Sequence, residues 1–298
     1  MKRLLLALLL VVAGAAMFLG PPLRAAFAST HVDITLGRAE LHPTSQALNF
    51  LLKPPTDDKF GKEVKLWATY YHMPTVRPAA QNIAAAKPLL GRNGKAISPP
   101  LSIADWCDAA MQGSVWVDNG EDEPTAYMYV DSGGPDQVAC DRHFGDLSDT
   151  IKVATRHARF VPFHHPKACD VRAIPLMAFR TVAVDPAVFR IGTVLYIPSL
   201  RGKGFWLDGQ LYAHDGYVVA SDTGGAIEGN HIDMFVANAN VAPFPETVHS
   251  NPRGTFQAFV VDKDDPAAIA LKAANEEVCR DSDRPGRKLK RTAAPGSI

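Results

Sequence analysis

The sequence predicts a mainly β fold built around a closed barrel, with long insertions and a second small β-rich region. Two features indicate this fold. Short β-branched or aromatic runs recur after residue 174, and Gly, Pro, Asn or Asp residues separate them. Long periodic stretches are rare, whereas 22 Gly and 23 Pro residues occur, which disfavours a helical bundle. Short strands at this spacing, with little helix between them, favour a closed barrel over a parallel α/β sheet.

The overall composition excludes several classes of protein. The chain has 298 residues, of which 47% are hydrophobic and 21% charged, and its formal net charge is 0. This balance excludes a disordered chain, a collagen-like chain and a strongly basic nucleic-acid binder. The length suffices for one large domain or two small ones.

Residues 1–28 are expected to be a signal peptide. Lys2 and Arg3 precede an apolar run over residues 4–20, and residues 26–28 (Ala-Phe-Ala) have the form of a signal-peptidase site. We therefore expect export to the periplasm or cell envelope, with no stable membrane span after cleavage. The alternative is an uncleaved N-terminal anchor, because the apolar run approaches the length of a spanning helix. Removing this segment takes away three basic residues and leaves 28 basic against 31 acidic ones, a net of −3.

The four cysteines predict disulfide bonds rather than a metal or redox site. None of them forms a Cys-x-x-Cys pair, and an even number in an exported chain favours two disulfides. Three pairings remain open among Cys107, Cys140, Cys169 and Cys279.

The first half of the chain divides into three expected segments. Residues 29–62 are polar and rich in Pro and Lys, and are expected to form an N-terminal arm. Residues 63–100 are expected to hold the first barrel strand, at 64–71, and a long loop. Residues 101–173 are expected to form an insertion or second subdomain. Within it, the sequence predicts a helix over 103–111 with Ser102 as its N-cap, and strands at 114–117 and 126–130.

Residues 174–262 carry the strongest strand signals and are expected to form the barrel core. The predicted strands lie at 181–184, 193–197, 217–221, 232–236 and 255–261. Residues 263–298 are expected to be a C-terminal segment ending in a basic tail, because residues 279–298 hold six basic and two acidic side chains.

The segment 222–233 (Asp-Thr-Gly-Gly-Ala-Ile-Glu-Gly-Asn-His-Ile-Asp) is the most informative part of the sequence. Asp222 follows an apolar strand and Asp233 opens the next one, so two carboxylates flank one Gly-rich connection. Gly224 and Gly225 permit a tight turn and leave an open surface where a polymer could lie. Asp185 places a third carboxylate at another strand end. The alternative is that these aspartates only cap turns by accepting backbone N–H bonds.

The run from 180 to 236 resembles the three-aspartate (3D) domain of the membrane-bound lytic transglycosylase A (MltA) family. Its pattern is apolar-Ala-apolar-Asp-Pro ending at Pro186, then Gly-Thr at 192–193, then every fixed position of the motif from Asp222 to Asp233. A Thr-x-Tyr on the first strand also fits, at Thr69 and Tyr71. The clear resemblance covers about a fifth of the chain, and an additional loop at about 199–215 departs from the smallest family members. The resemblance implies a double-psi β-barrel.

The resemblance also implies an activity and roles for these residues. The implied substrate is the glycan strand of peptidoglycan, cleaved between N-acetylmuramic acid (MurNAc) and N-acetylglucosamine (GlcNAc), with no cofactor and no metal. Asp233 would be the single acid/base, while Asp222 and Asp185 shape and polarise the groove. Thr69 and Tyr71 would line it, although strand aromatics such as Tyr71 often belong to a core.

An acid role requires Asp233 to stay protonated. We expect charge repulsion from Asp222, together with partial burial, to raise the pKa of Asp233 above its ordinary value of about 3.9. The two carboxyl groups would then titrate as a coupled pair.

Several other interpretations of the sequence compete with the enzyme. A non-catalytic, expansin-like barrel that grips wall polysaccharide is the main alternative. Asp131-Ser132-Gly133-Gly134 has the form of a trypsin-like nucleophile motif, and Asp222-Thr223-Gly224 that of an aspartic protease, but the partner motifs are missing or poorly spaced. A metal site is disfavoured because adjacent strand residues point to opposite faces. Its candidate ligands would be His157, His164, His165 and Asp170.

Overall fold

The computed structural model describes most of the chain after the N-terminal segment. The described residues are 43–81, 83–120, 124–163, 176–207, 209–237, 243–248 and 251–282. The predicted signal peptide, residues 29–42 of the N-terminal arm and the basic tail beyond residue 282 lie outside them, as do His164, His165 and Asp170. Among the described residues, no helix combines the length and the apolar character needed to cross a membrane.

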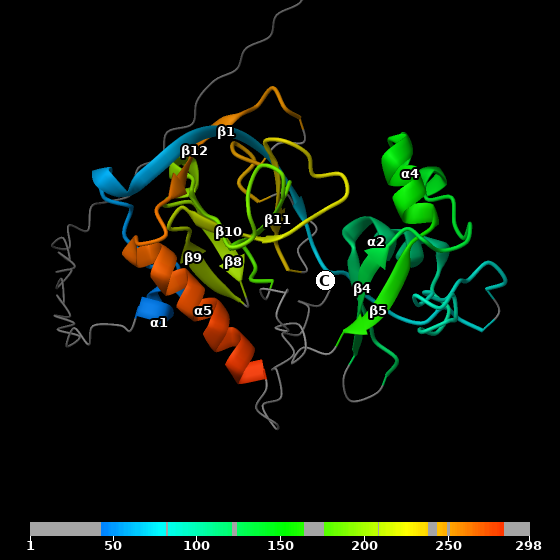
Figure 1. Cartoon of the computed structure of the whole chain (residues 1–298). Coiled ribbons are helices and arrows are strands. Elements are labelled where there is room, and N and C mark those ends of the chain that lie inside the picture. Colours follow the sequence, from blue (N-terminus) through cyan, green and yellow to red (C-terminus); the bar gives the residue numbers. More distant parts are fainter. Residues whose placement is uncertain are drawn as a thin grey trace, which may run out of the picture. The chain divides into compact units, whose positions relative to one another are not determined.

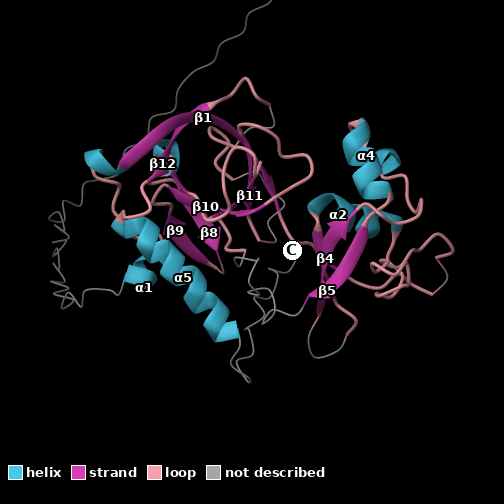
Figure 2. Ribbon diagram, viewed as in Figure 1, coloured by secondary structure: helices cyan, strands magenta, loops and turns pink. Residues whose placement is uncertain are grey.

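Six strands close into a barrel in the order β1-β11-β6-β10-β7-β12. The sequence predicted a closed barrel but not this order. Figures 1 and 2 label four of the strands, β1, β10, β11 and β12. All six coincide with predicted strands to within a few residues. They are β1 (Phe60–Tyr71), β6 (Thr181–Val184), β7 (Val194–Tyr196), β10 (Tyr217–Asp222), β11 (His231–Phe235) and β12 (Phe256–Val261). Two of the pairings are parallel, β1 with β11 and β6 with β10, and the others are antiparallel.

Alternating side chains of these strands fill the barrel. Leu66 on β1, Val182 on β6 and Ile232 on β11 are fully buried members of one apolar cluster. Each is flanked in sequence by residues that face away from this cluster, as the pleat of a strand requires. The two faces of the barrel wall therefore have different roles.

Strands β7 and β10 are buried on both faces because two helices cover their outer side. Helix α1 (Pro43–Leu48) and helix α5 (Pro266–Ser282) lie side by side over this part of the wall (Figure 1). The alanines and Leu271 of α5 pack against Tyr196 and Tyr217. Helix α5 was not predicted, although Asp265 and Pro266 form a helix-start signal, with the Asp265 carboxylate accepting from the N–H of Ala267.

A second sheet has the order β2-β3-β4-β5. Its last three strands lie in the region 101–173 that was expected to be an insertion, whereas β2 lies in the segment 63–100, where a long loop was expected. Its strands are β2 (Thr75–Val76), β3 (Ser114–Val117), β4 (Thr125–Asp131) and β5 (Arg159–Phe163). Three helices accompany them: α2 (Ile103–Gln112), α3 (Asp141–Phe144) and α4 (Asp149–Arg156). The predicted helix cap is confirmed, since the Ser102 hydroxyl accepts from the N–H of Asp105. Helix α4 and strand β5 were missed, because this polar, His-rich stretch carries only a short apolar pattern.

One disulfide joins helix α2 to the start of α3. It links Cys107 to Cys140 and lies within the apolar core of this second region. This bond agrees with one of the three pairings that the sequence left open. Cys169 and the side chain of Cys279 lie outside the described part of the chain.

The additional loop expected at 199–215 is a short 3-10 turn followed by a hairpin. The turn is η3 (Pro198–Leu200), and the hairpin pairs β8 (Gly204–Leu207) with β9 (Gln210–Ala213). Phe205 points into the barrel core, whereas its neighbour Trp206 is 67% exposed. A second 3-10 turn, η1 (Asp57–Lys59), precedes β1.

A buried ion pair ties the N-terminal helix to the barrel. The Arg180 guanidinium binds both carboxylate oxygens of Asp215, and the Nη2–Oδ2 distance is 2.7 Å. It also donates to the backbone carbonyl of Ala47 on α1 and to that of Tyr217. The side chains of Arg180 and Asp215 are only 1% and 3% exposed. Removal of either partner would leave a buried charge uncompensated.

We therefore expect Asp215→Asn to lower the free energy of unfolding by about 3–5 kcal/mol, because the Arg180 charge stays buried without a counter-charge. Urea unfolding followed by circular dichroism measures this loss. Glu246→Gln is the matched control, since the Lys203–Glu246 pair is 41% and 70% exposed and exposed pairs contribute less than about 1 kcal/mol. Equal losses in the two variants would contradict the assigned role of the buried pair.

Candidate active site

The parallel pairing of β1 with β11 places Thr69 beside Asp233. Their Cα atoms are register partners. Ala68 on β1, like Ile232 and Met234 on β11, belongs to the barrel core. Because side chains alternate along a strand, Thr69 and Asp233 lie on the outer face of the wall. Two residues 164 positions apart in sequence thus meet on one surface.

Ala183 of β6 lies between Asp222 and Asp233 in the strand register. It is the register partner of Asp233 on β11 and of Asp222 on β10. Three adjacent strands therefore carry an Asp-Ala-Asp row, whose outer Cα atoms are about 10 Å apart. The methyl group of Ala183 is small enough for the two longer acidic side chains to lean toward each other above it.

A β-bulge in β10 turns Asp222 into this row. Val218 and Ala220 point into the barrel core, so strict alternation would also point Asp222 inward. The register instead shifts between Ala220 and Asp222, and Ser221 is the extra residue. Bulges of this kind re-aim a side chain at the end of a strand. The sequence carries no clear signal for this shift.

Each of the two carboxylates accepts a hydrogen bond from a hydroxyl group of β1. The Thr69 Oγ1–Asp233 Oδ1 distance is 2.7 Å, and the Tyr71 Oη–Asp222 Oδ2 distance is 2.6 Å. The ring of Tyr71 is 8% exposed and packs against Phe235. This burial favours the alternative in which Tyr71 is a core residue, and its hydroxyl reaches the site through Asp222.

Burial is the main cause of the raised pKa values of both carboxyl groups. Asp233 has its pKa raised from 3.8 to about 6, first by burial and then by the charge of Asp222, while a hydrogen bond donated by Thr69 lowers it. Burial also raises the pKa of Asp222, against the hydrogen bonds that it accepts from Tyr71 and the Thr223 N–H. The sequence had placed charge repulsion first, but desolvation is the larger effect at Asp233.

Asp185 has a different environment from the other two aspartates. Its carboxylate accepts from the backbone N–H of Ala187 and from that of Gly229, each at 2.8 Å. These bonds lower its pKa, so it is ionised at neutral pH. Through Gly229, which has a φ of 63°, Asp185 holds the second turn of the Gly-rich connection in place just before β11 begins.

The paired glycines of the motif serve different purposes. A Cβ atom on Gly224 would lie 2.7 Å from Cγ1 of the buried Ile227, so the close packing there requires glycine. A Cβ atom on Gly225 would meet nothing within 4 Å. Gly225 therefore keeps the surface of the connection open.

His231 and Trp67 extend the site along the same outer face. Their rings are stacked, with centroids 3.6 Å apart and planes 4° from parallel. The Nε2 atom of His231 lies 2.8 Å from the hydroxyl oxygen of Thr69. Trp67 was not among the predicted site residues, although its spacing from Thr69 and Tyr71 places it on the same face of β1.

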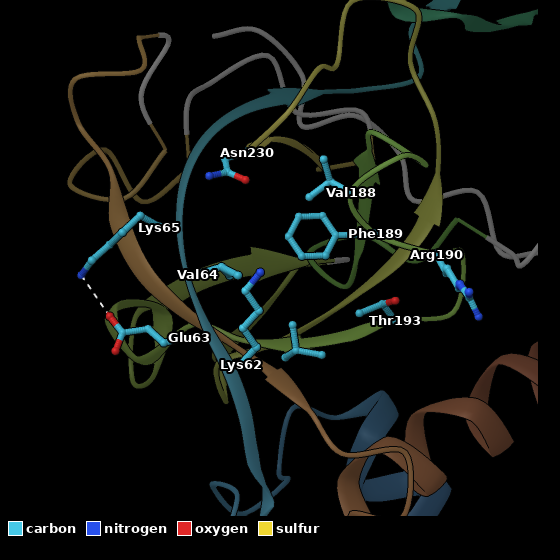
Figure 3. A pocket seen from close by; sticks show the side chains of 10 residues that line it. Lys62, Glu63, Val64, Lys65, Val188, Phe189, Arg190, Thr193 and Asn230 are labelled. Atoms are coloured by element: carbon cyan, nitrogen blue, oxygen red, sulfur yellow. Dashed lines mark ion pairs between the residues drawn. The ribbon is translucent and has the colours of Figure 1, made fainter.

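A cavity of about 510 Å³ lies between residues of β1, the segment 188–193, Asn230 and Val260 (Figure 3). Phe189, Val64 and Val260 form its apolar part, and all three pack on the barrel core. Lys65 turns aside to an ion pair with Glu63, as Figure 3 shows. None of the three predicted site aspartates lines this cavity. The candidate site is therefore the outer face of the wall rather than this cavity.

The raised pKa of Asp233 predicts that its ionised form lowers the free energy of unfolding at neutral pH. Between pH 3.8 and about pH 6, Asp233 keeps its proton in the folded chain but has lost it in the unfolded chain. The free energy of unfolding therefore falls as the pH rises through this window. Asp233→Asn removes the cost. We expect the variant to be more stable than wild type above about pH 6, by up to about 3 kcal/mol. Thermal unfolding across the pH range measures this difference, which should vanish below about pH 4; a constant difference would contradict it.

Solved structures similar to this chain include those of lytic transglycosylases. MltA from E. coli, with bound chitohexaose, has a TM-score of 0.45 and 17% identity, covering 66% of this chain and 71% of that chain. The membrane-bound lytic murein transglycosylase from Agrobacterium tumefaciens has a TM-score of 0.44 and 14% identity, covering 72% and 78%. MltA from Neisseria gonorrhoeae has a TM-score of 0.39 and 14% identity, covering 66% and 72%.

The family match lies on the segment that builds the site. No curated protein sequence matches the chain. The 3D domain family matches residues 180–243, which include Asp185, Asp222 and Asp233. This match confirms the resemblance to the 3D domain that the sequence motif indicated, over residues 180–243.

Proposed function

We propose that the chain is an exported peptidoglycan lytic transglycosylase with Asp233 as its single acid/base. One observation carries this proposal: a largely buried carboxyl group, with its pKa raised to about 6, lies beside a second carboxyl group on an open strand surface of a 3D domain. We also assign the barrel to the double-psi type, which its two parallel strand pairs support.

The proposed reaction needs only one group that gives and then takes a proton. Protonated Asp233 donates its proton to the glycosidic oxygen as the bond from C1 of MurNAc to GlcNAc breaks. The resulting carboxylate takes the proton from the 6-hydroxyl of the same MurNAc, whose oxygen bonds to C1 and closes a 1,6-anhydro ring. Asp233 ends protonated, as it began. No water is activated, so the second carboxylate of an ordinary glycosidase is not required.

The neighbours of Asp233 have supporting roles in this proposal. The charge of Asp222 favours the protonated form of Asp233, and Tyr71 orients Asp222 through its hydroxyl. Asp185 holds the turn before β11. Thr69 contacts Asp233 directly, the tight turn at Gly224 and the open surface at Gly225 leave room for the glycan strand, and both glycines are assigned to substrate binding.

A digest of purified sacculi tests the reaction. Residues 29–298 are incubated with sacculi, and the released muropeptides are read by mass spectrometry. We expect products lighter by one water than hydrolysis products from the wild type, and none from Asp233→Asn. Asp264→Asn is the control. Asp264 is an exposed aspartate in a turn, so this variant makes the same chemical change outside the site and should leave the products unchanged.

Other outcomes of this digest would redirect the proposal. Hydrolysed products would keep a glycosidase but discard the one-carboxylate mechanism. The absence of products, with the protein still pelleting on sacculi, would favour the expansin-like binding barrel. Cleavage retained in Asp233→Asn would overturn the assignment of the acid.

The acid role also predicts how the rate depends on pH. Because Asp233 must be protonated to act, kcat/KM is expected to fall about tenfold per pH unit above about 6. Turnover of a soluble glycan fragment across the pH range measures this limb. A rate that stays level from about pH 5 to about pH 8 would show that some other group supplies the proton.

A further inference from the structure

The hydroxyl hydrogen of Thr69 has two acceptors within reach. Oγ1 lies 2.7 Å from Asp233 Oδ1 and 2.8 Å from His231 Nε2. A hydroxyl group carries one hydrogen, so it can donate to only one of these atoms at a time. Both contacts are hydrogen bonds only if the other neighbour donates to the Thr69 oxygen. The protonation states of His231 and Asp233 are therefore linked through Thr69.

The surroundings of His231 select one tautomer of a neutral ring. Burial lowers the pKa of His231 to about 4, so the imidazole carries one proton while Asp233 titrates. The backbone of Ala226 makes a hydrogen bond that favours a proton on the ring. Since Nε2 faces Thr69, we place this proton on Nδ1, which leaves Nε2 as an acceptor.

The elements around His231 hold the ring in this state. β1 presents the stacked Trp67 and the Thr69 hydroxyl, and β11 presents Asp233 through Thr69. Asp185, the charged group at the end of neighbouring β6, is engaged by the backbone of Ala187 and Gly229. The stack on Trp67 fixes the ring plane, so Nε2 stays directed at Thr69.

We propose that His231 is a positioning residue that keeps the proton on Asp233 by accepting the hydroxyl hydrogen of Thr69. In this arrangement, the carboxyl group of Asp233 donates to Thr69 Oγ1, Thr69 donates to His231 Nε2, and Nδ1 of His231 donates to the backbone of Ala226. If Asp233 lost its proton, the Thr69 hydroxyl would donate to the carboxylate instead. A lone pair of Thr69 Oγ1 would then face the lone pair of His231 Nε2, which is unfavourable. The inference concerns the protonation of Asp233, and it rests on the proposed function only for its effect on cleavage.

Carboxyl-carbon NMR tests this inference without any assay of activity. The full mature chain is labelled at the aspartate carboxyl carbons, and Asp233 is assigned by its absence in Asp233→Asn. His231→Phe keeps a ring stacked on Trp67 but removes the acceptor. Thr69 is then free to donate to Asp233, and we expect the pKa of Asp233 to fall by about one pH unit. His143→Phe, a change in an exposed histidine paired with Asp108, is the control and should leave it unchanged.

Measuring the same substitution in a Thr69→Val protein separates the hydrogen-bond relay from Asp233 through Thr69 to His231 from a general effect of the substitution. In Thr69→Val the link is absent, so adding His231→Phe should shift the pKa of Asp233 by much less than it does alone. An equal shift in both backgrounds, or no shift in His231→Phe, would overturn the proposal while leaving the proposed transglycosylase reaction untouched.

Nitrogen NMR of the wild-type imidazole tests the tautomer directly and needs no folded variant. At about pH 5, between the pKa of His231 and that of Asp233, we expect His231 to be neutral, with its proton on Nδ1 and an unprotonated Nε2. A proton on Nε2 would mean that His231 donates to Thr69, which contradicts the relay. Failure of the sacculus digest with this tautomer confirmed would instead discard the reaction and keep the relay.

Discussion

The parallel pairing of β1 with β11 is the constraint on which the candidate site depends. It joins the first strand of the barrel to a strand that follows more than 150 residues later, and its register sets Thr69 against Asp233. A slip of one residue would turn Thr69 into the barrel and place an apolar side chain beside the acid. Because Leu66, Ala68, Ile232 and Met234 fill the core, that slip would also expose the apolar face. Core packing and site geometry thus enforce the same register.

The arrangement of Asp222 and Asp233 on either side of β6 depends on one small residue, Ala183, and on one β-bulge in β10. Ala183 lets two acidic side chains share the surface above β6, and the bulge at Ser221 brings Asp222 to that surface. These two features place ionisable groups close together on a largely buried face, where charge is costly. The raised pKa values of Asp222 and Asp233 express that cost.

Stability elsewhere in the domain offsets this unfavourable site. The barrel has one continuous apolar core, helix α5 buries the outer side of β7 and β10, and the Arg180–Asp215 pair ties α1 to the wall. The site aspartates are held mainly by single hydroxyl and backbone hydrogen bonds. The carboxyl groups of Asp222 and Asp233 therefore keep an environment that disfavours their ionised forms, which suits a group that must hold a proton.

The sequence by itself determined the barrel strands, the Ser102 helix cap, the 3D motif and the identity of the acidic residues, because each follows from short-range patterns of side chains. It did not predict helix α5 or the β8–β9 hairpin, although Asp265-Pro266 and Asp208-Gly209 carried local signals for both. Only the tertiary structure decided that Ala183 separates the carboxylates, that a bulge re-aims Asp222, that Tyr71 is buried and that His231 reaches Thr69. These features depend on which strands pair and in which register, and contacts between residues so distant in sequence leave no periodic pattern along the chain.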